Sequence, residues 1–353
     1  MSPKIHTRTL QQMDGEGAPV FVLRGHKAAV NCVKFSSEHG KLEILSGALD
    51  GEVRIWDIET RRPSVAFKAH EQSILQVLCL SNGRFVTQSK EGNVALWDKS
   101  ASSLKKPVVS FDTSAYGFCR CSVVESGGGS PLIVTPSAHQ SRLLVWDFKA
   151  PAPVHKIDLS QQNPSGEKFG MINHASMWSS QDSNVVSNVV SWASESGHVG
   201  VYSLRGAKSL ATGSLAKQPI MCMDVLRNKI GCLGFAGSAE GRLSAFSANF
   251  STGEVKEHKG IQISNKGLSD LCIRSDRRIF ATAGWDRRVR IFKCQTLDQL
   301  GILKYHTESV FATDFDSPSS GYIVSGSKDK SIAVFEAYKQ AEKRTGGEKK
   351  TTR

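Results

Sequence analysis

Residues 281–292, ATAGWDRRVRIF, join a short turn to a strand of alternating polarity that ends in an aromatic residue. The pattern recurs along the chain as SGALDGEVRIWD (46–57), SKEGNVALWD (89–98), SAHQSRLLVWD (137–147), SESGHVGVYS (194–203), SAEGRLSAF (238–246) and SKDKSIAVF (327–335). Neighbouring terminal aromatics lie between 41 residues apart (Trp56 to Trp97) and 56 residues apart (Trp146 to Tyr202). This spacing is close to the roughly 40–45 residues of a four-stranded propeller blade.

The alternation within each segment indicates a sheet that is covered on both faces. Val53 and Ile55 fall on one face of the first strand, and Arg54 and Trp56 fall on the other. Packing groups on both faces are expected where each small sheet lies between two neighbours around a central axis. The seven copies therefore predict an all-β, seven-bladed β-propeller.

The two ends of the repeat pattern predict how the ring closes. An isolated apolar run, Val20–Leu23, precedes the first repeat, and the last repeat stops after its third strand at Phe335. We therefore expect this N-terminal strand to complete the last blade, which would hide the exposed edges of an open array. The expected organisation is a flexible segment at 1–17, one propeller at 18–338 and a basic disordered tail at 339–353. Two Gly-, Pro- and Ser-rich stretches, 126–130 and 149–170, are predicted to be loops.

Composition favours a soluble protein that acts inside the cell. The chain has no run of about 18 apolar residues and no apolar N-terminal core of a secretory signal. Its net charge is +12, but part of this charge lies in the basic tail, so nucleic acid is not expected as a direct ligand. The eight cysteines include no CxxC pair and lie mainly in apolar strand patterns, so we expect buried reduced thiols and no metal site.

Three sets of polar residues contain the ingredients of a hydrolase triad, but they recur from blade to blade. A catalytic triad is needed once, beside an oxyanion hole, whereas a structural network is needed in every blade. We therefore predict structural hydrogen bonds and no catalytic, cofactor-binding or metal-binding residue. In the blades between the second and the last, the full set is missing, with Gln140 and Ser196 at turn positions. The three sets are His26, Ser46, Asp50 and Trp56; His70, Thr87, Glu91 and Trp97; and His306, Ser325 and Asp329.

Over about residues 18–336 the chain resembles WD-repeat proteins, in which such sets form a tetrad that ties the inner loop of a blade to its third strand. Segments 117–120, 271–278, 281–292 and 304–306 are similar to the ASTRA-associated family of WD-repeat proteins. This resemblance implies a non-enzymatic adaptor, a monomeric subunit of a larger complex, found in cytoplasm and nucleus. It implies a role in the maturation and stability of phosphatidylinositol 3-kinase-related kinases. The implied partners are the ASTRA and Tel–Tti–Tti assemblies and the Hsp90 system, with links to DNA-damage signalling and chromatin remodelling.

Two other functions belong to different classes. A chromatin or phosphopeptide reader would need an aromatic cage or an arginine pocket at the central opening. A G-protein β subunit would need an N-terminal helix with several heptads to pair with γ. The 25 residues before His26 contain Gly15, Gly17 and Pro19 and no heptad, so a γ partner is not expected.

The turns between strands supply the candidate partner-binding residues, because rigid blades present variable loops. Trp285 is the leading candidate, since tryptophan and arginine dominate binding hot spots. The alternative is a purely structural role, in which Trp285 covers the turn of its own blade and the nearby arginines of the sixth blade are only solvated. Arg277, Arg278, Arg287 and Arg288 are expected to form one basic patch around Trp285 on the sixth blade. The other candidates are the residues just before the position of the turn acid in the remaining blades: Leu49, Lys90, His139, Glu195, Ala239 and Lys328.

Overall fold

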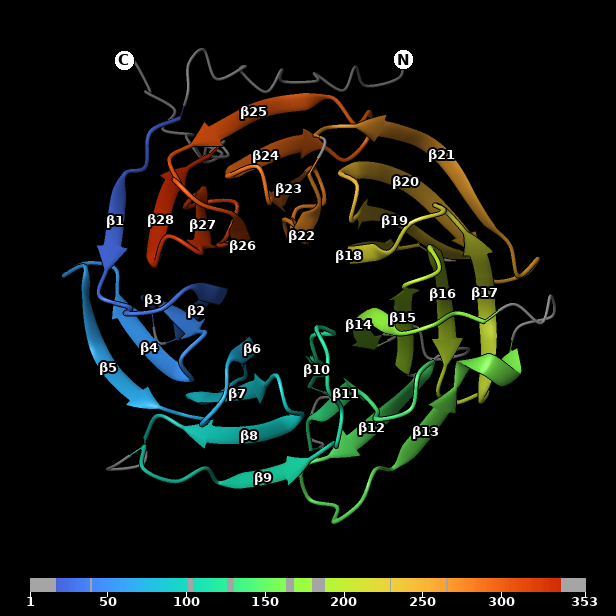
Figure 1. Ribbon diagram of the computed structural model, residues 1–353, viewed down its shortest axis with the longest axis horizontal. Helices are drawn as coiled ribbons and strands as arrows, with labels where there is room; N and C mark the ends of the chain where they lie inside the picture. The colour runs from blue at the N-terminus through green and yellow to red at the C-terminus, as the bar shows by residue number, and fades with distance from the viewer. Residues whose placement is uncertain are drawn as a thin grey trace, which may run out of the picture.

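The structure is a computed structural model that describes residues 17–337, except residues 39, 101–103, 126–129, 163–167, 180–187, 229 and 265. Seven antiparallel four-stranded sheets surround a central opening (Figure 1). The prediction of an all-β, seven-bladed propeller is therefore confirmed. The segments predicted to be flexible lie almost entirely outside the described residues.

The first four blades follow the chain around the ring, each running from an inner strand to an outer one. Blade one contains β2 (Val30–Glu38), β3 (Lys41–Ala48), β4 (Glu52–Asp57) and β5 (Arg62–Lys68). Blade two contains β6 (Ile74–Cys79), β7 (Arg84–Ser89), β8 (Asn93–Asp98) and β9 (Val109–Asp112). Blade three contains β10 (Ser122–Val124), β11 (Leu132–Pro136), β12 (Arg142–Asp147) and β13 (His155–Asp158). Blade four contains β14 (Ile172–Ser179), β15 (Asn188–Ser194), β16 (His198–Ser203) and β17 (Lys208–Ser214).

The last three blades complete the ring. Blade five contains β18 (Ile220–Arg227), β19 (Gly231–Ser238), β20 (Arg242–Asn249) and β21 (Val255–Gln262). Blade six contains β22 (Leu268–Ile273), β23 (Ile279–Gly284), β24 (Arg288–Lys293) and β25 (Gln299–Lys304). Blade seven contains β26 (Val310–Phe315), β27 (Tyr322–Ser327), β28 (Ser331–Glu336) and β1 (Phe21–Arg24).

The N-terminal strand closes the ring as expected. β1 pairs antiparallel with β28, with Phe21 opposite Val334 and Leu23 opposite Ile332. Both Phe21 and Leu23 are buried, so the closure combines backbone hydrogen bonds with apolar packing. The first and last segments of the fold thus share one sheet.

One of the two loop predictions is wrong. Residues 149–170 contain the outer strand β13, which pairs with β12, and a 3-10 helix, η1 (Leu159–Gln162). The strand was missed because an outer strand exposes most of its side chains, and the short sequence HKID therefore shows little apolar alternation. The other predicted loop, 126–130, falls mainly outside the described residues.

The core lies between neighbouring sheets. The rings of Phe235 in blade five and Phe280 in blade six stack with centroids 4.2 Å apart, and Phe280 stacks in turn on Phe292 at 5.3 Å. All three side chains are fully buried. A buried side chain of this size contributes roughly 1.5–3 kcal/mol relative to an exposed one. The cysteines are free thiols, and six of the eight are buried.

Buried and partly buried aspartates on inner strands join one arc of the ring. Asp224 of blade five accepts a hydrogen bond from the backbone N–H of Ile273 in blade six at 2.9 Å. Asp270 of blade six accepts from Thr313 N in blade seven at 3.0 Å. Charge-assisted bonds of this kind are stronger than bonds between neutral groups. A third link runs from Asp314 in blade seven to Phe35 N in blade one at 2.9 Å.

Candidate protein-interaction site

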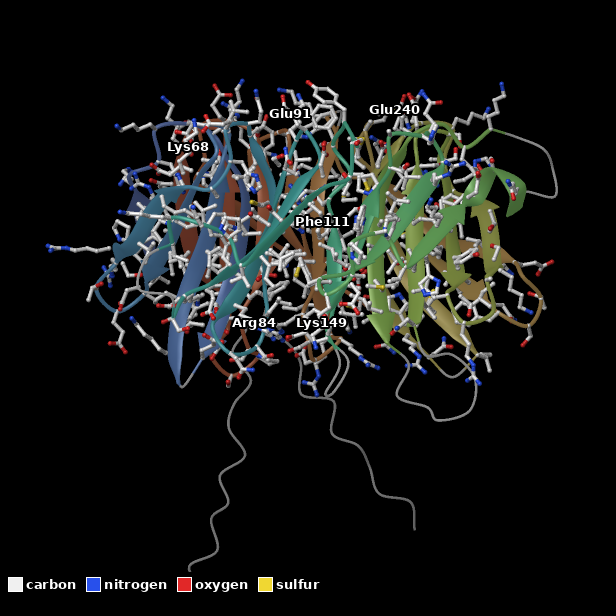
Figure 2. All side chains as sticks on the ribbon, turned by 90° about the horizontal axis from the view of Figure 1, so that it is seen from below. Lys68, Arg84, Glu91, Phe111, Lys149 and Glu240 are labelled. Carbon is white, nitrogen blue, oxygen red and sulfur yellow. The ribbon has the colours of Figure 1, made fainter. Side chains whose placement is uncertain are left out.

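The ring has two faces that carry different loops. Glu91 and Glu240, in turns between the second and third strands of their blades, lie on one face in Figure 2. Arg84, at the start of a second strand, and Lys149, after a third strand, lie on the opposite face. We call the first the upper face and the second the lower face.

In blades one and two, the predicted polar sets form partial networks beneath the upper face. Nε2 of His26 lies 2.7 Å from Oγ of Ser46, and the indole of Trp56 donates to the same oxygen at 2.8 Å. In blade two, His70 and Trp97 contact Oγ1 of Thr87 at 2.7 and 2.9 Å. These contacts tie the loop before each blade to its second and third strands.

The turn acids of these two blades do not join the networks. Asp50 instead accepts a hydrogen bond from the backbone N–H of Glu52, and a Glu52 carboxylate oxygen lies 3.4 Å from Nδ1 of His26. Glu91 is exposed. Burial lowers the pKa of both His26 and His70 to about 4, so both rings are neutral at physiological pH.

Blade seven contains the complete network among the histidine, hydroxyl and acid. Nε2 of His306 contacts Oγ of Ser325 at 2.8 Å, and Nδ1 contacts Oδ2 of Asp329 at 2.9 Å. Burial opposes ionisation of Asp329, but hydrogen bonds from His306 and Ser331 outweigh it and hold the pKa of the carboxyl well below its usual value. The hydroxyl of Ser325 is fully buried, which withdraws it from any substrate in solvent.

The other blades replace the histidine network in different ways. In blade four Trp192 is buried, and a Cβ at Gly200 would lie 2.5 Å from its ring, so the glycine makes room for the indole. In blade six, Arg290 forms a bidentate pair with Asp286 at 2.6 and 3.1 Å. In these two blades, side-chain packing and an Arg–Asp ion pair therefore stabilise the blade in place of the histidine network.

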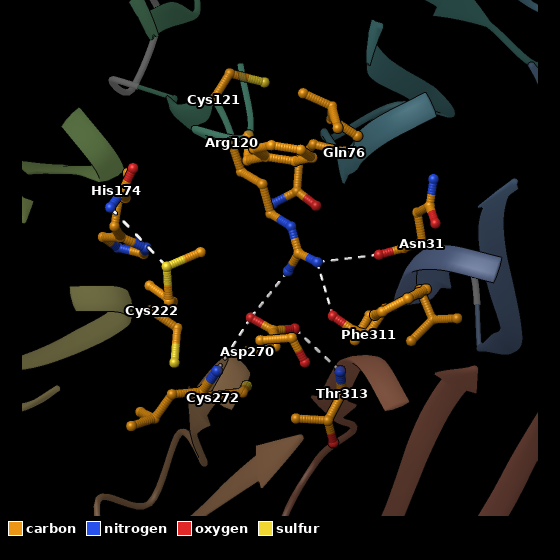
Figure 3. Close-up of a pocket in the computed structure, with 18 of the residues that line it drawn as sticks. Asn31, Gln76, Arg120, Cys121, His174, Cys222, Asp270, Cys272, Phe311 and Thr313 are labelled. Carbon is orange, nitrogen blue, oxygen red and sulfur yellow. Dashed lines mark hydrogen bonds and ion pairs between the residues drawn. The ribbon is translucent and has the colours of Figure 1, made fainter. Parts of the chain in front are cut away.

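A cavity of about 680 Å³ occupies the central opening. Arg120, just before β10, reaches across it and donates from Nη2 to the carbonyl oxygens of Asn31 at 3.0 Å and Phe311 at 2.7 Å (Figure 3). Its Nη1 pairs with Asp270 at 3.0 Å. One side chain of blade three thus contacts blades one, six and seven.

Exposed apolar side chains and a lysine gather at the upper mouth of this cavity. Tyr116 and Phe118, on the loop between β9 and β10, are 71% and 61% exposed, and Leu49 of blade one is 55% exposed. Nζ of Lys90 lies 4.9 Å from the ring centroid of Phe118 and 5.5 Å from that of Tyr116. We call Leu49, Lys90, Tyr116 and Phe118 the mouth cluster.

The structure brings together only some of the predicted partner-binding residues. Trp285, Lys90 and Lys328 line the cavity. Arg287, in the same turn as Trp285, and Arg288, the first residue of β24, are both exposed.

The position of Trp285 is compatible with both hypotheses, that it binds a partner and that it covers the turn of its own blade. It is half-buried, and a Cβ at Gly267 would lie 2.5 Å from its ring, so it covers the loop that enters its own blade.

The expected single patch of four arginines on blade six is not present. Arg277 and Arg278 precede β23, whereas Trp285, Arg287 and Arg288 follow it. A strand of six residues separates the two groups by about 20 Å. Arg277 and Arg278 therefore belong to the lower face.

Sequence reasoning missed Arg120, Tyr116 and Phe118 as individual residues. Two aromatic residues on either side of Gly117, in a connection between blades, were a usable sequence signal. No periodicity indicates that Arg120 crosses the opening, because its partners come from distant repeats.

Within the described residues, no group of three or more His, Cys, Asp or Glu side chains is placed to hold a metal ion. No helix in the same part of the chain is long and apolar enough to span a membrane.

The fold and the site together define a seven-bladed β-propeller that presents an apolar and basic surface at its central opening. The family described as WD domain, G-beta repeat matches residues 17–57, 253–293 and 297–336. Each match begins in or near the outer strand of one blade and ends with the third strand of the next.

Among known proteins, the chain is 26% identical over 326 residues to guanine nucleotide-binding protein subunit beta-like protein 1 of Mus musculus, covering 91% of this chain and 96% of the relative. It is 25% identical over 370 residues to ASTRA-associated protein 1 of Schizosaccharomyces pombe, covering 91% and 99%. The protein of the same name from Penicillium rubens is 26% identical over 389 residues, covering 90% and 86%.

Proposed function

We propose that this chain is a non-enzymatic adaptor that recruits proteins to an assembly of the ASTRA type, in both cytoplasm and nucleus. The exposed mouth cluster is the observation that carries the adaptor role. Large exposed apolar side chains mark interaction sites, and aromatic residues are enriched in binding hot spots. By contrast, the hydroxyls of Ser46, Thr87 and Ser325 are buried within the networks that hold the blades together.

The kind of assembly is supported by the relatives named ASTRA-associated protein 1, which align with most of this chain. By the resemblance described above, the adaptor acts in the maturation and stability of phosphatidylinositol 3-kinase-related kinases, beside Tel–Tti–Tti and the Hsp90 system. Its part in DNA-damage signalling and chromatin remodelling would follow from the supply of those kinases. The ring is the rigid support, and its loops make the contacts.

The test is affinity purification of the tagged full chain from its own cells, followed by mass spectrometry. We expect ASTRA and Tel–Tti–Tti components to co-purify, and depletion of the chain to lower the steady-state amount of the kinases. Capture of none of these components, together with unchanged kinase amounts, would contradict the proposal. Capture of a G-protein γ subunit would instead support a signalling function.

A further inference from the structure

We propose that the mouth cluster binds an extended protein segment that places an aromatic or leucine side chain beside one or more carboxylates. This inference rests on the adaptor function proposed above and specifies the partner chemistry that the site recognises. It is carried by three observations: where the exposed apolar groups lie, how their loop is held, and which charge lies between them.

The apolar part of the cluster lies next to a cavity that accepts a side chain. Phe118 and Leu49 line the central cavity, and so do the partly exposed Met221 and the buried Met223. Methionine adapts its shape to irregular apolar ligands. An aromatic or leucine side chain of a partner would therefore be buried between the exposed Phe118 ring and this cavity lining.

The loop that presents the aromatic rings is fixed at both ends. At one end, the backbone N–H of Thr113 donates to the carbonyl of Gly92 at 3.1 Å, and its hydroxyl donates to the same oxygen at 3.0 Å. At the other end, the buried amide of Gln88 donates to Cys119 O at 3.0 Å and accepts from Cys121 N at 2.6 Å. A loop held in this way is already ordered, so a partner does not bear the entropic cost of ordering it.

The positive charge of Lys90 selects for a partner segment that is negatively charged. Its ammonium lies against the rings of Tyr116 and Phe118, and among the described residues no carboxylate oxygen lies within 4.0 Å of it. Because this cation already occupies the aromatic faces, an incoming cation would be repelled. A carboxylate, by contrast, would pair with Lys90 at a partly desolvated position. The site therefore favours an acidic segment over a basic or methylated histone tail.

The test is a selection of displayed random peptides on the purified full chain, followed by affinity measurements on the enriched peptides. We expect the enriched sequences to combine acidic residues with an aromatic residue or leucine. Phe118→Ala should weaken their binding by on the order of 10-fold or more, as at an interface hot spot. Lys90→Gln should weaken acidic peptides and leave their glutamine-substituted counterparts unchanged. Ile230→Ala and Lys149→Gln, both at the lower face, are the matched controls.

Three outcomes would overturn the inference. These are no enrichment of acidic peptides, enrichment of basic or methyl-lysine peptides, and binding that is insensitive to Phe118→Ala in a variant that melts like the wild type. The same variant separates this inference from the adaptor proposal. If wild-type chain captures ASTRA components but the selected peptides ignore Phe118, the adaptor stands and the mouth cluster is not its docking site.

Discussion

The side chain of Arg120 donates hydrogen bonds to two backbone carbonyls of the inner strands β2 and β26. Asn31 and Phe311 each lie at a β-bulge, where the register of the inner strand shifts by one residue. A bulge leaves a residue unpaired with its neighbouring strand. In both blades the carbonyl of the bulged residue accepts from Arg120. The arginine therefore stabilises two irregular strands and also the charge of Asp270.

Replacing Arg120 with methionine should destabilise the ring by roughly 2–4 kcal/mol, because two carbonyls and a partly buried carboxylate lose their partner. Urea unfolding measures this loss. Arg142→Met is the matched control, since Arg142 pairs with Asp158 at 2.8 Å near the rim of blade three. That pair should contribute less than about 1 kcal/mol. Equal effects of the two substitutions would show that Arg120 has no special structural role.

The partly buried His70 should make stability depend on pH in a defined window. The pKa of His70 is about 4 in the folded protein and about 6.5 in the unfolded chain. Between these values the unfolded chain binds a proton that the folded chain does not. The contribution of His70 to the free energy of unfolding is therefore fully present above pH 6.5 and is lost as the pH falls toward 4. The full effect is roughly 3 kcal/mol for this one side chain.

The pH dependence is tested by chemical unfolding of wild type and His70→Asn across this window. The variant should lose less stability on acidification than the wild type. Because both proteins contain the same carboxylates, the difference between their curves of unfolding free energy against pH reports His70 alone. His139→Asn, at an exposed position, should follow the wild-type curve. Parallel curves for wild type and His70→Asn would contradict a lowered pKa of His70 in the folded protein.

At the scale of elements, periodicity predicted the strands well where both faces are buried. The segment that ends at Phe292 became β24, and Val20–Leu23 became β1 with a shift of one residue. The predicted histidine networks were incomplete where the acidic side chain of the turn can bond its own backbone or water in place of the histidine. Asp50 bonds its own turn, and Glu91 points to solvent, although both occupy the position at which Asp329 meets His306.

The failed arginine patch has a topological cause. Arg278 and Arg287 are near one another in sequence, but an antiparallel strand between them carries the chain from one face to the other. The mouth cluster shows the converse. Leu49, Lys90 and Phe118 come from three successive repeats and line one cavity because their blades are arranged around the central opening. Sequence alone therefore predicts residues within a blade better than sites between blades.

The closing strand β1 should be essential to cooperative folding. Deletion of residues 1–24 removes the fourth strand of blade seven and exposes the edge of β28, so we expect thermal unfolding to lose its single sharp transition. A milder variant, Leu23→Ala, should cost roughly 2–5 kcal/mol, because Leu23 is fully buried. Val20→Ala, at a half-exposed position, should cost little. A deletion variant that melts as sharply as the full chain would refute this role.

At the scale of the whole molecule, the ring is stabilised unevenly. Blades one, two and seven contain histidine networks, and aspartates link blades five, six, seven and one in succession. In blade three, Trp146 contacts Thr135 at 3.1 Å without a histidine partner, and blade four depends on the packing of Trp192 against Phe169. Blade six, which lacks the histidine set, is strengthened by the pair of Arg290 and Asp286.

Native-state hydrogen exchange should resolve this unevenness. Comparable second strands are the fairest probes: β11 and β15 in the weaker arc, β3 and β27 in the stronger one. Each missing network removes hydrogen bonds that contribute about 1 kcal/mol each, so β11 and β15 should open at a free energy roughly 1–3 kcal/mol lower. Because Arg120 ties blade three across the opening, Arg120→Met should lower the protection of β11 further while leaving β15 nearly unchanged. If β3 and β27 were the least protected strands, the polar networks would not be what stabilises their blades.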